Sequence, residues 1–204
     1  VATDEPEPNY SEIVVMDRLV LKNLTGLYDY RRNHIFIQYM DGKDKQLTSG
    51  MFDEHSISWT PDGEEIVFVS DRGEMRALYV RNDLYAVSMN GEIREVFSNQ
   101  GAVYSPQSSP DGTMIAFLAT TRSDTSNDSV AEDSHLHLVS REGGESRDLL
   151  KELDRPCNSF IWSLDSKSLL FTCNDMGKIP LFSVSIENPE IREFVSGDWQ
   201  TSRR

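Results

Sequence analysis

Residues 58–72 read SWTPDGEEIVFVSDR, a Pro-Asp-Gly turn followed directly by an apolar run. Asp and Gly tolerate the backbone dihedrals of a tight turn, so Asp62-Gly63 predicts a hairpin between two strands. The run EIVFVS at 65–70 is almost continuously apolar, which is typical of a strand buried on both faces. Such a hairpin occurs in many β proteins, so its meaning depends on whether the chain repeats it.

The hairpin phrase occurs twice more, as SSPDGTMIAFLATTR at 108–122 and as WSLDSKSLLFTCND at 162–175. Its turn aspartates are separated by 49 and then 54 residues; they are Asp62, Asp111 and Asp165. A period of about 40–55 residues indicates a repeat architecture built from one supersecondary unit.

Each repeat reads as four short strands joined by turns rich in Asp, Asn and Gly. In the second repeat the expected strands are 55–60, 65–70, 84–89 and 92–97. In the third they include 114–120, 135–140 and 146–150, and in the fourth they are 159–163, 169–173, 181–186 and 191–195. The first repeat is irregular, with expected strands at 13–22, 34–40 and 44–48. Helical periodicity is nearly absent.

Tandem four-stranded antiparallel units are the blades of a β-propeller. A β-sandwich also has many short strands, but it would not repeat the same hairpin at the same place in each unit. We therefore expect an all-β fold, a β-propeller segment of about four four-stranded antiparallel blades. The expected division is a flexible acidic lead-in at 1–12 and a partial β-propeller at 13–204, with blades at approximately 13–50, 51–99, 100–151 and 152–197.

The composition limits the possible partners. The 204 residues carry a net charge of −14, and such a surface repels phosphate backbones, so nucleic acid is not an expected partner. The acidity serves solubility or, alternatively, attracts cationic substrates. No stretch approaches the roughly 18–20 consecutive apolar residues of a membrane span, so no membrane partner is expected. The N-terminus has no recognisable secretory leader, and we expect a cytoplasmic protein of which this chain is a piece.

The sequence carries no motif of nucleophilic catalysis or nucleotide binding. It has no Gly-x-Ser-x-Gly, no Gly-x-x-x-x-Gly-Lys and no Gly-x-Gly-x-x-Gly. His135 and His137 point to one face of an expected strand, but no spaced ligand accompanies them, so an outward polar face is the simpler interpretation than a metal site. The turn aspartates fit no calcium loop. We expect no catalytic residue, no cofactor and no metal.

Two tryptophans and two histidines have structural interpretations. Trp59 and Trp162 occupy equivalent places at the ends of first strands, where packing between blades is the favoured role and a ligand platform the alternative. His34 and His55 stand alone and are interpreted as structural.

Cys157 and Cys173 flank one hairpin, and folding it about Asp165-Ser166 brings the two cysteines nearly opposite each other. A cross-strand bridge is geometrically possible, and two buried free thiols are the favoured alternative.

One loop cluster is a candidate for binding. Aromatic and arginine side chains gather there at the start of a blade, where they suit a partner domain or a peptide carboxylate. The candidates for a substrate or domain interface are Tyr28, Tyr30, Arg31 and Arg32, with a plain surface loop as the alternative. The polar segment 122–134 is a long loop for which simple solvent exposure is favoured over function.

The run DRLVLKNLTGLYDYRRNHIFIQYMDGKDKQLTSG at 17–50, followed by the first hairpin, resembles the propeller domain of prolyl oligopeptidase-type serine peptidases. It is most similar to the acylaminoacyl-peptidase-like branch. The positions that carry the resemblance are Arg18-Leu19, His34, Ile35, Phe36, Leu47, Thr48 and Gly50. It covers about residues 13–195, and its Pro-Asp-Gly hairpins are shared with TolB-like propellers.

The resemblance implies a non-catalytic role for this chain. In that family an α/β-hydrolase domain follows the propeller and carries the nucleophile, while the propeller covers its active site and restricts access to short peptides. The implied partners are a hydrolase domain of the same parent chain and short peptides. The alternative is a TolB-like protein-binding propeller with no enzymatic domain. Because an open array leaves an apolar face at each end, self-association through exposed blade faces is also expected.

Overall fold

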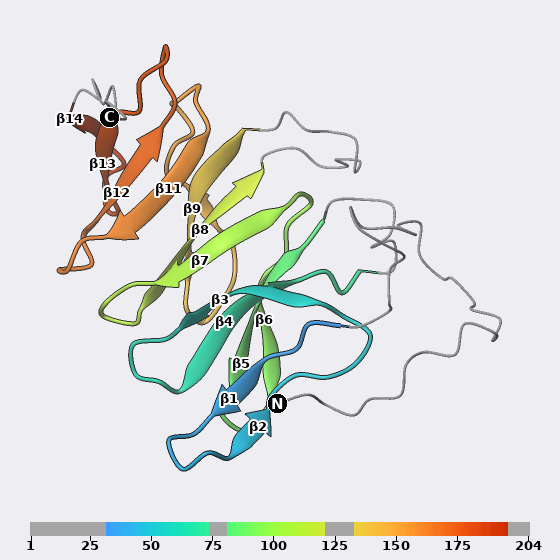
Figure 1. The fold of residues 1–204 in the computed structure, drawn as a ribbon. Helices are drawn as coiled ribbons and strands as arrows, with labels where there is room; N and C mark the ends of the chain where they lie inside the picture. Colours follow the sequence, from blue (N-terminus) through green and yellow to red (C-terminus); the bar gives the residue numbers. More distant parts are fainter. Residues whose placement is uncertain (1–31, 74–80, 121–132, 196–204) are drawn as a thin grey trace, which may run out of the picture. The chain divides into compact units, whose positions relative to one another are not determined.

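The computed structural model describes residues 32–73, 81–120 and 133–195, and every regular element in these ranges is a β-strand (Figure 1). The predicted all-β class is therefore confirmed. The lead-in at 1–12 and the expected strand at 13–22 lie outside the described residues. None of the described residues belongs to a helix that is long and apolar enough to cross a membrane.

The strands form three four-stranded antiparallel sheets and one hairpin, each sheet in simple meander order. The hairpin consists of β1 (Phe36–Gln38) and β2 (Asp44–Gln46). The second blade consists of β3 (Glu54–Trp59), β4 (Glu65–Ser70), β5 (Asp83–Ser88) and β6 (Ile93–Phe97). The third consists of β7 (Val103–Ser108), β8 (Met114–Thr120), β9 (Ser134–Ser140) and β10 (Arg147–Asp148). The fourth consists of β11 (Cys157–Trp162), β12 (Ser168–Cys173), β13 (Leu181–Ser185) and β14 (Ile191–Val195).

The repeated hairpin has the same hydrogen bonds in all three blades. In the second blade the Thr60 hydroxyl donates to Asp62 Oδ1 at 2.7 Å, and the same oxygen accepts the Glu64 N–H at 3.0 Å. The equivalent hydroxyl-to-carboxylate bonds are Ser109–Asp111 at 2.6 Å and Ser163–Asp165 at 2.7 Å. The turn closes through a residue at positive φ, namely Gly63 at 74°, Gly112 at 72° and Ser166 at 60°. The turn aspartates therefore act in turn formation, as their spacing predicts.

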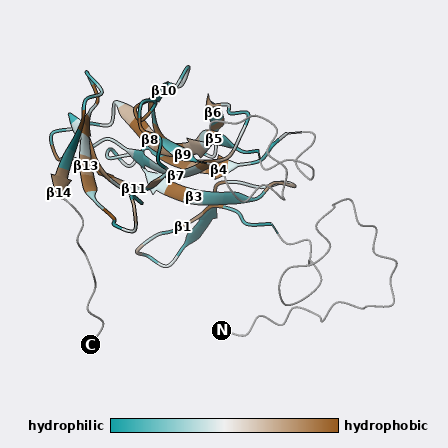
Figure 2. Ribbon diagram, turned by 90° about the horizontal axis from the view of Figure 1, so that it is seen from above, coloured by the Kyte–Doolittle hydropathy of each residue, from teal (hydrophilic) through white to brown (hydrophobic). Residues whose placement is uncertain are grey.

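The core lies between the blades. Strand β8 illustrates this, because its side chains alternate between the two neighbouring sheets. Phe117 and Ile115 pack with Val67 and Val69 of the second blade. Leu118 on the opposite face packs with the fourth blade. Hydrophobic segments run along the strands of all three sheets (Figure 2).

The hairpin β1–β2 covers the remaining face of the second blade. Ile35 and Ile37 pack with Phe68 and Val87, all of them buried. This accounts for the continuous apolar run of β4, since its alternate residues face two different neighbours.

Candidate functional site

Each blade has two ends that differ in construction. We call the end with the three repeated hairpins the turn end. We call the opposite end, where first strands begin and second strands finish, the loop end. The first strands of adjacent blades lie side by side, β3 next to β7 (Figure 1). Between β7 and β11 the Gln107 amide donates to Phe160 O at 3.1 Å, and the Trp162 indole N–H donates to Gln107 O at 3.1 Å.

Of the four residues in the predicted binding loop, the structure describes only Arg32. Tyr28, Tyr30 and Arg31 lie outside the described residues. The Arg32 side chain is 5% exposed, and its Nη1 lies 3.5 Å from Asp53 Oδ2 at the loop end of the second blade. Its role as a substrate or interface residue stays a prediction.

A buried carboxylate next to this pair organises the loop end. The Glu54 side chain is fully buried, and its Oε1 accepts from Arg72 Nη2 at 2.9 Å. Its Oε2 lies 2.8 Å from His34 Nδ1 and accepts from the Thr48 hydroxyl at 3.1 Å. Because Glu54 and Arg72 belong to the second blade while the other two precede and follow the first hairpin, the network joins two sheets. His34 is thus structural, as predicted.

The Arg72 guanidinium also contacts three aromatic rings. It lies 4.9 Å from the Phe52 ring centroid, 5.6 Å from that of Phe68 and 5.0 Å from that of Tyr85. Desolvated cation–π contacts contribute more than exposed ones, so the rings stabilise the buried cation. Burial also raises the pKa of Tyr85 to about 12, which keeps its hydroxyl protonated.

The turn end has its own ionic cluster, which lies across the interface between the second and third blades. Arg94 donates to both carboxylate oxygens of Glu65, at 2.8 and 2.9 Å. Arg141 of the third blade donates to Glu65 Oε2 at 3.0 Å and to Asp62 Oδ2. The bond from Arg94 lowers the pKa of Glu65. The bond from Arg141, with those from Thr60 and the Glu64 backbone, holds the pKa of Asp62 well below its ordinary value.

An arginine recurs at one register position of the outermost strand in each of the three four-stranded sheets. The register pairs are Ala86–Arg94, Leu138–Arg147 and Ser183–Arg192. In the second and third blades this arginine lies where the following blade docks, since Arg141 meets the Arg94–Glu65 pair and Arg147 donates to Ile186 O. Arg141 and Ile186 are themselves equivalent, each being the first residue after a third strand.

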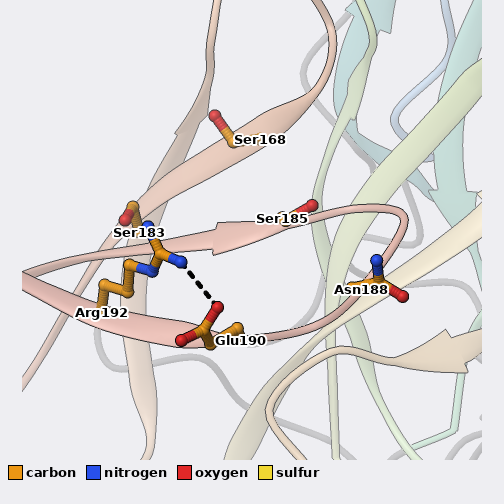
Figure 3. A pocket seen from close by; sticks show the side chains of 6 residues that line it. All are labelled: Ser168, Ser183, Ser185, Asn188, Glu190 and Arg192. Carbon is orange, nitrogen blue, oxygen red and sulfur yellow. Dashed lines mark hydrogen bonds and ion pairs between the residues drawn. The ribbon is translucent and has the colours of Figure 1, made fainter.

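In the fourth blade the equivalent place is an open hollow of about 380 Å³ (Figure 3). Arg192 lies there with Glu190, whose Oε2 accepts from Arg192 Nη2 at 2.7 Å. The other lining residues are Ser168, Ser183, Ser185 and Asn188. This outer face is more polar than its equivalents, because Ser183 stands where the third blade has Leu138 and the second has Ala86. Self-association through this face stays a prediction.

The two histidines of β9 lie half-buried toward the second blade and not on an outward face. The His137 ring stacks on Phe117 with centroids 5.7 Å apart, and its Nδ1 lies 3.1 Å from Ser146 Oγ. Burial lowers the pKa of His137. His135 Nδ1 lies 2.8 Å from Asp148 Oδ2. Side chains along β9 alternate between its two faces. Leu136 and Leu138 pack toward the fourth blade, so His135 and His137 face the second blade.

Neither histidine forms a catalytic or metal-binding constellation. A triad needs one histidine between a nucleophile and a carboxylate, whereas here the serine and the carboxylate contact different rings. Across the three described ranges no group of three His, Cys, Asp or Glu side chains is placed to hold a metal ion.

The first strands carry both apolar and polar side chains that are exposed. Ile57 is 59% exposed, Trp59 49% and Ile161 59%. The bulges of β3 and β7 place Ser56 and Ser105 at positive φ of 50° and 49°, and these bulged residues are exposed. Packing between blades is confirmed for Trp162 by its bond to Gln107, but Trp59 is half exposed.

No protein-family model and no curated protein matches the sequence. The structure is similar to a TolB protein from Agrobacterium tumefaciens, with a TM-score of 0.53 and 19% identity over 76% of this chain and 50% of that one. It is similar to a puromycin-hydrolyzing peptidase from Mycobacterium tuberculosis, with a TM-score of 0.56 and 16% identity over 75% and 26%. It is also similar to the β-propeller domain of the trilobed protease from Pyrococcus furiosus, with a TM-score of 0.52 and 18% identity over 76% and 44%.

Similar structures further include oligogalacturonate lyases. At these identities the likeness establishes the fold, which is that of propeller blades. The chain spans half or less of the length of the three proteins described above.

Sequence reasoning missed the Glu54 network and the recurrent arginine. The network joins residues 20 and 18 positions apart, and no local pattern marks it. The arginine did leave a signal, because Ile-Arg-Glu occurs at 93–95 and again at 191–193, in the fourth strands of two blades.

Proposed function

We propose that this chain is the non-catalytic propeller segment of a serine peptidase of the prolyl oligopeptidase type, of the acylaminoacyl-peptidase or oligopeptidase kind. In this role the blades cover the active site of an α/β-hydrolase domain in the same parent chain. They restrict access to short peptides. A cytoplasmic location is part of the proposal.

One observation carries the proposal. The blades are similar in fold to the propeller domain of a protease, and the run at 17–50 resembles the corresponding run of peptidase propellers. The described residues bring no serine, histidine and carboxylate together as a triad. A domain with this fold whose described residues form no triad suits a role in substrate selection next to a separate catalytic domain.

The mechanism is exclusion by size. Propeller blades surround a central channel, and here the first strands supply the inner edge of the array. Their bulges at Ser56 and Ser105 are exposed on that side, together with His55 and Tyr104. Short, extended peptides pass such an opening, whereas folded proteins do not.

The test compares this chain with the full-length product of its gene. Chromogenic acyl-amino-acid and short-peptide substrates are offered to both proteins. We expect hydrolysis by the full-length protein alone, abolished by a reagent specific for active-site serine. Hydrolysis of a folded protein substrate at a rate similar to that of a short peptide would contradict the gating role.

A second candidate function is that of a TolB-like propeller, which binds a protein partner and has no enzymatic domain. The observation that favours it is the exposed apolar pair on β3, Ile57 and Trp59, since exposed apolar surface marks interaction sites. If the full-length protein lacks peptidase activity, a partner captured by the wild type and lost by the Ile57→Ser, Trp59→Ala variant supports this reading.

A further inference from the structure

The two cysteines of the chain occupy one rung of the fourth blade. Cys157 begins β11, Cys173 ends β12, and the two are register partners. Both are free thiols and both are buried, at 2% and 0% exposure. Directly opposite residues on antiparallel strands have Cα atoms about 4.5–5.5 Å apart, which lies within the roughly 4.4–6.8 Å that a disulfide spans.

The rung lies at the loop end of its hairpin, where the ladder is irregular. A bulge shifts the register between Cys157 and Ser159, directly after the rung. The Cys157 thiol donates only a weak bond to Ser159 O at 3.7 Å. Strand ends next to a bulge open at lower free energy than the middle of a sheet, so the rung can be reached by local opening.

Cys173 also forms part of the wall of a hollow of about 390 Å³. The hollow is lined by Arg155, Asp175 and Phe182, and Arg155 Nε lies 3.2 Å from Asp175 Oδ1. Asp154 and Glu193 complete the charged lining, so three carboxylates face one guanidinium. The hollow therefore favours a positively charged small molecule over a negatively charged one.

We propose that Cys157 and Cys173 form a reversible cross-strand disulfide, and that a small organic disulfide, preferably an amine-bearing one, enters through this hollow to form it. This inference is independent of the peptidase proposal, because it concerns one hairpin and needs no catalytic domain.

The reaction is two successive thiol–disulfide exchanges. The Cys173 thiolate attacks one sulfur of the small disulfide, forms a mixed disulfide and releases one thiolate, which takes up a proton. The Cys157 thiolate then attacks the Cys173 sulfur and releases the second small thiol. The protein dithiol loses two electrons and two protons, and the small disulfide is reduced to two thiols.

Cys173 is the entry residue because it lines the hollow. Burial raises the pKa of Cys157 to about 12 and also raises that of Cys173, so both exchanges are slow until the rung opens. Slow exchange distinguishes this pair from a catalytic dithiol.

The test uses the 204-residue chain without substitution. The protein is incubated under native conditions with cystamine, a dication, or with oxidised glutathione, and is then alkylated and digested with trypsin. Cleavage at Lys151, Lys167 and Lys178 separates the cysteines into peptides 152–167 and 168–178, because Arg155 precedes Pro156 and resists the enzyme. We expect these peptides to appear joined, and the melting temperature of the oxidised protein to rise by roughly 5–10 °C and to return on reduction.

Two comparisons test the entry route. Cystamine should react about tenfold faster than oxidised glutathione, and Glu193→Gln should reduce that ratio, whereas the remote control Glu92→Gln, with the same change in charge, should not. In Cys157→Ser the reaction should stop at a mixed disulfide on Cys173, and Cys173→Ser should react far more slowly. Equal rates for the two reagents, or equal rates for the two serine variants, would overturn the entry route.

The proposed disulfide is contradicted if two thiols per chain still titrate after denaturation of the treated protein. It is also contradicted if the joined peptides arise only between chains. Peptide mapping of the wild type gives this answer even if a serine variant does not fold. A peptidase assay on the full-length protein is unaffected by either outcome, so failure here is distinct from failure of the proposed function.

Discussion

The turn end and the loop end of the blades both use hydroxyls, carboxylates and arginines, but only the turn end repeats its arrangement. At the turn end the hydroxyl-to-carboxylate bonds of Asp62, Asp111 and Asp165 reach two residues away and recur in all three four-stranded sheets. At the loop end Glu54 binds residues 20 and 18 positions distant, and among the described residues this arrangement is found in the second blade alone. The repeated bonds of the turn end specify the fold of each blade. The Glu54 network at the loop end distinguishes the second blade from the other two four-stranded blades.

Burial is the second difference, and it sets the sizes of the expected effects. The Glu54 side chain is fully buried, whereas those of Glu65 and Asp62 are 16% and 43% exposed. A buried charge that loses its partner costs far more than a partly solvated one. Substitutions at the two ends should therefore lower the free energy of unfolding by different amounts, even where they remove a similar number of bonds.

The largest effect is expected for Glu54→Gln. The substitution removes the fully buried charge and leaves the Arg72 cation, whose side chain is 19% exposed, without its carboxylate, so we expect a loss of about 3–5 kcal/mol in the free energy of unfolding. Urea denaturation followed by tryptophan fluorescence measures it. Glu190→Gln, which removes an ion pair in which both side chains are more than two-thirds exposed, is the control and should leave the midpoint unchanged. If Glu54→Gln lowers the free energy of unfolding by less than about 1 kcal/mol, burial does not make the loop end more sensitive to substitution than the turn end.

The second prediction compares a glycine from each end. Gly143, in the turn after β9, has φ +94°, and a Cβ there would meet Val96 O at 2.9 Å. Gly177 at the loop end has φ +79° and open space around it. We expect Gly143→Ala to cost about 2–3 kcal/mol, from backbone strain plus displacement of the neighbouring blade, and Gly177→Ala about 1 kcal/mol from strain alone. Equal midpoint shifts in urea would show that this turn is not packed tightly against the preceding blade.

The third prediction concerns the stability of the folded protein at acid pH. The pKa of Glu65 and that of Asp62 are both lowered in the folded state from ordinary values of 4.5 and 3.8. The unfolded state therefore binds more protons, and the stability from these groups is present above about pH 5 and is lost as the pH falls below it.

The melting temperature should fall between pH 5 and pH 3 in the wild type, and less steeply in the Asp62→Asn, Glu65→Gln variant. At pH 7 we expect Glu65→Gln alone to cost about 1–2 kcal/mol, reduced by solvent screening. Parallel pH curves for the two proteins would show that other carboxylates dominate acid unfolding.

The smallest effect is expected at Ser166, where two contributions oppose each other. Its φ of 60° favours glycine, but its hydroxyl accepts the N–H of Asp111 at 3.0 Å, from the hairpin of the preceding blade. Ser166→Gly should change the free energy of unfolding by less than about 0.5 kcal/mol, whereas Ser166→Ala, which keeps the strain and loses the bond, should cost about 1–2 kcal/mol. If alanine and glycine behave alike, the hydroxyl rather than the backbone determines this position.

The two ends also differ in what the sequence reveals about them. The strand 65–70 and the strand 114–120 were predicted with their observed bounds, because hairpin chemistry and apolar runs are local signals. The expected strand 146–150 is shorter in the structure, as β10 contains only Arg147–Asp148. Its last two residues, Leu149 and Leu150, are buried in the core, which explains their hydrophobicity, and the Leu149 N–H still donates to Leu136 O at 2.9 Å.

Non-local partners could not be predicted in the same way. The orientation of His137 depends on which neighbouring blade each face of β9 meets, which requires the stacking order. The burial of Glu54 depends on the first hairpin folding back over the second blade. The candidate residue Arg32 was found through composition, and its placement next to Asp53 follows only from the fold.

The contacts beside the recurrent arginines make the interface between successive blades depend on the order of synthesis. Arg94 bonds Glu65 within its own blade, and Arg141 of the following blade adds a bond to that same carboxylate. Arg147 donates to Ile186 O, which also lies in the following blade. Domains form from the N-terminus as the chain leaves the ribosome, at about 5–20 residues per second. A blade that has just emerged therefore lacks these bonds for a few seconds until the following blade arrives, so these blades should fold one after another in the order of translation.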